Sequence, residues 1–251
     1  MLLVDKKAVI YGGGGSIGGA VARAFAREGA TVYLAGRTRE RLERVADEIR
    51  AGGGVAQTAE VDALDERAVD QHAESVAAEA GSIDISFNVI THGDVQGTPM
   101  AEMELDDYTR PVFTAVRTTF LTWRAAARHM TRQGSGVILA FGGEGDPPRG
   151  YNLGGLQTAF HAIESMRRQL ASELGPRGVR VVTLRTGGVP ESIPEGFKGR
   201  DEISDGIEKA TMLGRAATLE DVGNVAAFVA SDRARTMTAA TVNVSAGALI
   251  D

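Results

Sequence analysis

The chain has 251 residues, a hydrophobic content of 43%, a formal net charge of −6 and no cysteine. The acidic balance argues against nucleic acid or an anionic membrane as the main partner, and the lack of cysteine excludes disulfides, a thiol nucleophile and cysteine-bound metals. The four histidines show no metal-ligand spacing, so no metal site is expected. No segment is apolar for long enough to cross a bilayer, and no signal-peptide pattern precedes the first predicted strand, so we expect a cytoplasmic protein.

Short apolar segments alternate with amphipathic segments along the whole chain. The apolar segments, typical of strands in a parallel sheet that is buried on both faces, are Ala8–Tyr11, Thr31–Ala35, Val55–Val61, Ile83–Val89, Gly136–Phe141, Val179–Leu184 and Thr241–Val244. The segments with helical periodicity are Ile17–Glu28, Arg39–Arg50, Glu66–Ala80, Leu105–Arg132, Leu156–Leu174 and Leu219–Ser231. This alternation predicts one α/β domain over residues 1–251, a Rossmann-type doubly wound parallel sheet of about seven strands with helices on both faces.

The longest irregular stretch, Thr186–Ala217, is rich in glycine, proline and charged residues. A stretch of this length is more often functional than idle. We therefore expect a lid over a substrate pocket at about residues 187–215. The alternative is a surface insertion that takes no part in binding.

The first predicted strand leads into a glycine-rich loop, Gly12–Gly18, and then into a helical pattern. Glycine allows the sharp turn and the close backbone approach that a pyrophosphate needs, and the following helix directs its N-terminus at the phosphates. The alternative is a plain glycine turn, but a strand, a helix and a second strand surround this loop in the order that nucleotide binding requires. The loop residues predicted to bind the cofactor are Gly12, Gly14, Gly15, Ser16, Ile17 and Gly18.

The end of the second predicted strand bears on the choice between NAD(H) and NADP(H). An acidic residue at this place binds the ribose 2′-hydroxyl of NAD, but the chain has Gly36, followed by Arg37 and Thr38. A guanidinium suits a 2′-phosphate, so we expect Arg37 and Thr38 to bind NADP(H) in preference to NAD(H). The alternative is a solvated, basic start of the next helix.

Over its whole length the chain resembles a short-chain dehydrogenase/reductase. The glycine loop resembles the family's T-G-x-x-x-G-I-G, with Tyr11 in place of Thr and Ser16 in place of the middle Gly. Near the C-terminus, the segments that resemble those of the family are Gly214-Arg215, Glu220-Asp221-Val222, Ala230-Ser231-Asp232 and Thr236–Gly247. The resemblance implies a nicotinamide cofactor and an oxidoreductase activity.

The resemblance also implies further cofactor contacts and an oligomer. Asp62 and Ala63 resemble the family's D-V pair, whose aspartate holds the adenine, and Asn88 begins the segment that corresponds to N-N-A-G. Asp62, Ala63, Asn88 and Val189 are accordingly expected to bind the cofactor. Family members form dimers through the fourth and fifth helices and often tetramers, which implies a homodimer or homotetramer. The apolar stripes that fit such an interface are Val112, Val116, Phe120 and Trp123 on the fourth predicted helix, and Phe160, Ile163, Met166 and Leu170 on the fifth.

The four catalytic residues of the family, Asn, Ser, Tyr and Lys, are missing from the corresponding positions. Counted from the surrounding segments, these positions hold Ala115, Gly143, Leu156 and Phe160. No tyrosine is followed four residues later by lysine anywhere in the chain. A positioned general acid contributes on the order of 10²–10⁴ in rate, and leucine transfers no proton. We therefore expect ordinary carbonyl reduction to be very weak, with some hydride transfer left from orientation alone.

Three other polar residues are candidates to replace the missing groups. Glu144 follows the vacated serine position, Tyr151 precedes the vacated tyrosine position by five residues, and His92 follows the segment where the nicotinamide would lie. Each has a plainer, non-catalytic interpretation: Glu144 is then a solvated loop residue and Tyr151 an amphipathic cover at the start of a helix, and His92 takes no part in catalysis.

Two classes of function remain open. The first is an enzyme: an NADP(H)-binding oxidoreductase with a rebuilt or relaxed site, or a non-redox enzyme in which Glu144 or His92 transfers a proton. The second is a non-catalytic nucleotide-binding scaffold or a regulatory subunit beside an active paralogue. Because Gly143, Leu156 and Phe160 are apolar, the pocket is expected to take a largely hydrophobic small molecule.

Overall fold

The computed structural model describes residues 1–142, 151–197 and 199–250. One parallel sheet runs through the molecule in the strand order β3-β2-β1-β4-β5-β6-β7. The strands are β1 (Lys7–Tyr11), β2 (Thr31–Gly36), β3 (Val55–Glu60), β4 (Ile85–Asn88), β5 (Gly136–Gly142), β6 (Val179–Arg185) and β7 (Ala240–Asn243). The α-helices are α1 (Ser16–Arg27), α2 (Arg39–Ala51), α3 (Glu66–Ala80), α4 (Leu105–Gln133), α5 (Gly155–Leu174), α6 (Arg200–Lys209) and α7 (Leu219–Ala230).

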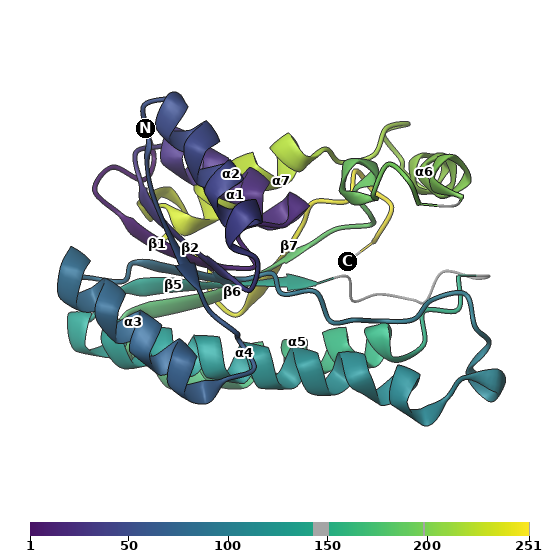
Figure 1. Ribbon diagram of the computed structural model, residues 1–251, viewed down its shortest axis with the longest axis horizontal. Coiled ribbons are helices and arrows are strands. Elements are labelled where there is room, and N and C mark those ends of the chain that lie inside the picture. Colours follow the sequence, from purple (N-terminus) through teal and green to yellow (C-terminus); the bar gives the residue numbers. More distant parts are fainter. Residues whose placement is uncertain (143–150, 198, 251) are drawn as a thin grey trace.

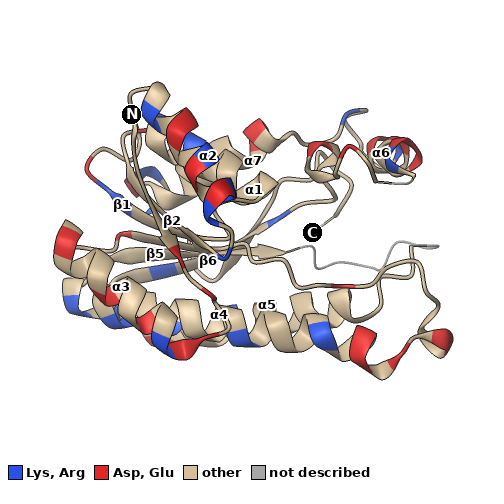
Figure 2. Cartoon of the chain, in the orientation of Figure 1, with Lys and Arg blue, Asp and Glu red and all other residues tan. Residues whose placement is uncertain are grey.

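The helices form two layers around the sheet. Figure 1 shows α1, α2 and α7 over one face and α3, α4 and α5 over the other. Each layer closes its own apolar core: Phe25 of α1 and Leu42 of α2 belong to one, and Met130 of α4 and Ile163 of α5 to the other. Most charged residues lie on the helices rather than on the strands, which agrees with a sheet covered on both faces (Figure 2).

The order of the strands places a crevice beside β1. This strand pairs with β2 on one side and with β4 on the other, so the direction in which the chain adds strands reverses between β1 and β4. In open α/β sheets, ligands bind outside the carboxyl ends of the strands at such a point. The strand order therefore predicts a ligand site at the loops that follow β1 and β4.

The predicted fold class is confirmed, and the bounds of the predicted strands and helices move by no more than two residues. One expectation is wrong: the stretch Thr186–Ala217 is not irregular throughout, because it contains α6 and a short 3₁₀ turn at Pro190–Ser192. Ile203 and Ile207 of α6 stand four residues apart and share one helix face, but Gly206 between them weakens the helical signal in the sequence.

A buried polar network fixes α5 to the sheet. Glu164 and Arg167 of α5 are each only 3% exposed and form an ion pair at 2.8 Å. Thr183 of β6 donates a hydrogen bond to the Glu164 carboxylate, and Thr241 of β7 donates another at 3.3 Å. Removing one partner of a buried pair leaves an uncompensated charge, so these contacts hold α5 in a defined position along β6 and β7.

The described residues contain neither a membrane-spanning helix nor a cluster of metal ligands. No helix in this part of the chain is long and apolar enough to cross a membrane. Within the same residues, no group of three or more histidine, aspartate or glutamate side chains is placed to hold a metal ion.

Candidate cofactor and substrate site

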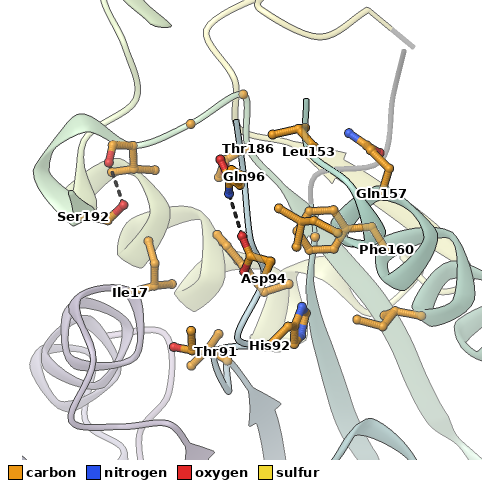
Figure 3. Close-up of a pocket in the computed structure, with 18 of the residues that line it drawn as sticks. Ile17, Thr91, His92, Asp94, Gln96, Leu153, Gln157, Phe160, Thr186 and Ser192 are labelled. Atoms are coloured by element: carbon orange, nitrogen blue, oxygen red, sulfur yellow. Dashed lines mark hydrogen bonds between the residues drawn. The ribbon is translucent and has the colours of Figure 1, made fainter. Parts of the chain in front are cut away.

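A cavity of about 810 Å³ lies at the carboxyl ends of the central strands. Ile17 at the start of α1, Asn88 at the end of β4 and Gly142 at the end of β5 contribute to its wall. Figure 3 shows Thr91 and His92 on the segment after β4, with Phe160 of α5 across from Ile17. One cavity therefore joins the predicted cofactor loop to the predicted catalytic positions on α5.

The glycine loop has the geometry that a phosphate needs. Gly12 has φ +87°, and a methyl group on it would lie 2.6 Å from the carbonyl oxygen of Val89. A methyl group on Gly18 would collide with the carbonyl oxygen of Gly12. Gly15 caps α1 without any side-chain hydrogen bond to the first turn. The loop thus tolerates no side chains at its tight points and leaves the N-terminus of α1 uncapped for an anion.

Arg37 and Thr38 follow β2 directly and are exposed. Thr38 is the N-cap of α2, and its side chain makes no capping hydrogen bond. No carboxylate among the described residues forms an ion pair with Arg37. Gly36 lies beside Glu60 in the sheet, and its own position offers no acidic group. The end of β2 therefore presents a guanidinium that no described carboxylate neutralises.

The other predicted cofactor residues have distinct roles in the structure. The carboxylate of Asp62 is exposed and accepts a hydrogen bond from the backbone N–H of Leu64 at 3.0 Å. Ala63 is buried, and Val189 lines the cavity. Asn88 is 9% exposed and lines the cavity as well.

The Asn88 amide joins β4 to α4. It donates to the hydroxyls of Thr118 and Thr122 at 3.4 and 3.2 Å, and its oxygen accepts from the backbone N–H of Ile90 at 3.0 Å. These bonds use the amide fully within the protein, so Asn88 positions the segment that follows β4.

Two of the four positions that the resemblance assigns to catalytic residues line the cavity with apolar side chains. Leu156 and Phe160 both lie in its wall. Ala115 does not, because it is fully buried in the core between α4 and the sheet. Gly143 lies outside the described residues. The α5 wall thus offers neither a proton donor nor a positive charge at the positions that the resemblance assigns to Tyr and Lys.

His92 lines the cavity next to Phe160. The two rings meet edge to face with their centroids 5.9 Å apart. Burial lowers the pKa of His92, and the nearby carboxylate of Asp94 opposes this shift. The lowered pKa favours the neutral imidazole over the charged form. His92 can therefore exchange a hydrogen bond with a ligand, but it is a poor source of a proton.

Tyr151 lies four residues before α5, which begins at Gly155. Its side chain is 36% exposed and lines the cavity. The hydroxyl oxygen contacts α6, since a methyl group on Gly206 would lie 2.7 Å from it. The aromatic ring thus bridges the approach to α5 and the predicted lid. Glu144, the third candidate, lies outside the described residues.

The segment that was predicted as a lid forms one wall of the cavity. Its lining residues are Gly187, Gly188, Val189, Ser192, Ile193, Ile203, Gly206, Ile207 and Ala210. The sequence did not single out Asp94 and Gln96, which also line the cavity. They lie in an irregular segment after β4 that has no periodicity, so nothing in the pattern tells which side chains face inward.

The family model described as enoyl-(acyl carrier protein) reductase matches residues 13–248. The short-chain reductase protein NovJ of Streptomyces niveus is 31% identical and aligns with 97% of this chain and 94% of its own length. A short-chain dehydrogenase/reductase from Serratia marcescens superposes with a TM-score of 0.88, 27% identity and full coverage of both chains. A structure of NAD⁺-bound xylitol dehydrogenase has a TM-score of 0.86, 24% identity and coverage of 98% and 99%, respectively. The chain therefore belongs to the short-chain dehydrogenase/reductase family of oxidoreductases, in which a nicotinamide cofactor is used.

Proposed function

We propose that the protein binds NADP(H) in preference to NAD(H) and transfers hydride to or from a largely hydrophobic small molecule, at a site without the family's general acid. The observation that carries the proposal is the single cavity that joins Ile17 and Asn88 to Leu156 and Phe160. A bound nicotinamide supplies or accepts the hydride. The protein supplies binding, orientation and an apolar wall.

The residues of the loops fit a dinucleotide. The crowded glycines at positions 12 and 18 and the uncapped start of α1 form a cradle that side chains would fill. Asp62 at the end of the β3 segment is exposed and its carboxylate remains accessible to an adenine or ribose group. Val189 and its neighbours after β6 would lie against the nicotinamide end.

Arg37 supports the choice of NADP(H). It is exposed, unpaired among the described residues and directly follows Gly36, the position where NAD enzymes have an acidic side chain. Charge-assisted hydrogen bonds from a guanidinium to a phosphate are about twice as strong as neutral ones. The 2′-phosphate that distinguishes NADP(H) is thus the natural partner of this side chain.

Calorimetric titration of the purified protein with NADPH and with NADH tests this proposal. We expect NADPH to bind more tightly than NADH. Arg37→Ala should lower the affinity for NADPH by about tenfold and leave the affinity for NADH unchanged. Arg44→Ala is the matched control, because Arg44 is an exposed arginine of α2, the helix that begins two residues after Arg37. Equal affinities for the two cofactors, or an equal loss of both in Arg37→Ala, would contradict the proposed preference. Failure of folded protein to bind either would favour a scaffold role.

We also propose a homodimer or homotetramer that uses the outer face of α4. On the predicted stripe, Val116 and Phe120 are 36% and 52% exposed, and Phe113 at 74% extends the apolar surface. Trp123 is not part of this outer surface, since it is 2% exposed and lines the cavity from the core side. Light scattering on the wild type and on Phe113→Glu should show an oligomer that the substitution shifts toward monomer. A wild-type monomer at high concentration would refute the assembly.

A further inference from the structure

The cavity carries an unusual combination of charge and aromatic surface. Its aromatic side chains come from α4, β5, the approach to α5 and α5 itself; they are Trp123, Phe141, Tyr151 and Phe160. Its charged side chain is Asp94, and no lysine or arginine of the described residues lines it. Aromatic faces and a carboxylate attract cations, and quaternary ammonium groups are bound in this way in many proteins.

The Asp94 carboxylate remains available to a ligand. Within the described residues it accepts one hydrogen bond, from the Gln96 amide at 2.6 Å (Figure 3). No lysine or arginine of these residues pairs with it. Arg110, which contacts the carbonyl of the adjacent Gly93 at 3.5 Å, is already paired with Asp107 at 2.7 Å. Asp94 therefore brings a negative charge to the cavity that no described cation neutralises.

The wall at Leu156 and Phe160 sets a second requirement. Reduction of a ketone leaves a negative charge on oxygen that a general acid must neutralise, and these two residues cannot do so. Burial lowers the pKa of His92 and so disfavours the charged imidazolium that would compensate. A substrate that suits this wall must therefore need no proton from the protein when it takes up hydride.

We propose that the substrate is a cation with an electrophilic C=N bond, an iminium ion with apolar or aromatic substituents, held by Asp94 and Phe160. This inference rests on the proposed hydride-transfer function. The iminium carbon accepts the hydride, the electron pair of the C=N π bond becomes the lone pair on nitrogen, and the reduced nicotinamide is oxidised in the same step. The product is a neutral amine, so charge and atoms balance without any proton transfer. The missing general acid is then no loss to the reaction.

Ligand binding can be measured apart from turnover, because Trp123 is the single tryptophan of the chain and lines the cavity. The probes are three phenyl compounds that differ in charge: benzyltrimethylammonium, benzyl alcohol and phenylacetate. We expect quenching of Trp123 fluorescence to show tightest binding for the cation and weakest for the anion. Asp94→Asn should lower the affinity for the cation by about tenfold and leave the affinity for the alcohol unchanged. Tightest binding of phenylacetate, or an unaltered preference in Asp94→Asn, would overturn the proposal.

Two further variants make the binding test specific. Asp5→Asn removes the same charge from an exposed position at the N-terminus, where φ is +63° and asparagine is well tolerated, and should behave as the wild type. Phe160→Leu removes the aromatic face and should lower the affinity for the cation by about threefold without changing the affinity for the alcohol. An equal effect of Asp5→Asn and Asp94→Asn would show that the preference comes from net charge rather than from the cavity.

Turnover then completes the test with N-methyl-3,4-dihydroisoquinolinium and the ketone 1-tetralone, which are similar in size. With NADPH we expect the iminium to be reduced faster than in buffer alone, and faster than the ketone. Reduction of the ketone at an equal or greater rate, or of the iminium only at the buffer rate, would overturn the inference. Calorimetric binding of NADPH is recorded on the same preparation, so a failure of the proposed cofactor function is recognised separately.

Discussion

The glycine-loop end of the cavity and its α5 end are built from different kinds of group. At the first end the site is formed by the backbone: Gly12 and Gly18 leave no room for side chains, and α1 starts without a cap. At the other end, family chemistry depends on side chains, and here Leu156 and Phe160 present only carbon. The fold constrains the residues of the glycine loop, because the loop must turn and pack. It does not require a tyrosine or a lysine on α5. Binding and catalysis can therefore diverge within one intact fold.

The largest expected effect comes from returning the family's groups to the α5 end. The double variant Leu156→Tyr/Phe160→Lys should raise the rate of ketone reduction with NADPH by about 10²–10⁴ if both side chains reach the cavity as the present ones do. The positive charge should at the same time lower reduction of an iminium substrate. Steady-state rates with the two substrates check this, and the single variants serve as controls. An unchanged ketone rate in a folded, cofactor-binding variant would mean that more than these positions separates this site from the family's.

A substitution at the loop end should instead weaken cofactor binding. The methyl group of Gly18→Ala would collide with the carbonyl oxygen of Gly12, so the loop must move. We expect a loss of NADPH affinity of about a hundredfold or more, measured by calorimetry. Gly175→Ala is the control, since a methyl group there meets no atom within 4 Å. Similar affinities for the two variants would show that the tight packing of the loop is not needed for the cofactor.

The free energy of unfolding should depend on pH through His72, which packs beneath the glycine loop. His72 packs against Tyr11, which directly precedes the loop, with their ring centroids 5.6 Å apart. Burial lowers the pKa of His72 to about 4 from 6.5. As the pH falls from 6.5 to 4, the unfolded chain takes up a proton that folded His72 does not, so the free energy of unfolding decreases by up to about 3 kcal/mol. Above pH 6.5 this residue causes no pH dependence.

Urea unfolding at pH 7 and pH 5 checks this for the wild type and His72→Gln. The variant should lose less stability between the two pH values than the wild type does. Burial lowers the pKa of His92 and His129 as well, so part of the decrease should persist in the variant. Identical losses in both proteins would show that His72 is not the group responsible.

The smallest effect is expected at Tyr151. Its hydroxyl lies against Gly206 of α6, so we do not expect it to donate a proton to a substrate. Tyr151→Phe should change kcat/KM by less than about threefold, whereas loss of a general acid would cost 10²–10⁴. The comparison uses whichever substrate the enzyme accepts best. A loss of a hundredfold would establish Tyr151 as a replacement for the missing acid.

The alternation of apolar and amphipathic segments was enough to predict the sheet and the main helices, because strand and helix periods differ clearly. The glycine loop was also readable, since its residue types follow from backbone geometry. Helix α6 was missed because it is short and contains Gly206, and the place of Asp94 in the cavity was missed because its segment has no period. The position of the Tyr151 hydroxyl depends on how α6 packs, which no local pattern encodes.

Rapid mixing of the NADPH-bound protein with an excess of a hydrophobic ketone such as 1-tetralone tests the contrast between the two ends most directly. The fluorescence of bound NADPH reports the loop end, and its decay reports the α5 end. We predict a clear fluorescence signal for bound NADPH that persists for many seconds after the ketone is added. Rapid, ketone-dependent loss of that signal would contradict the account, because it would require a proton donor that the α5 wall does not provide.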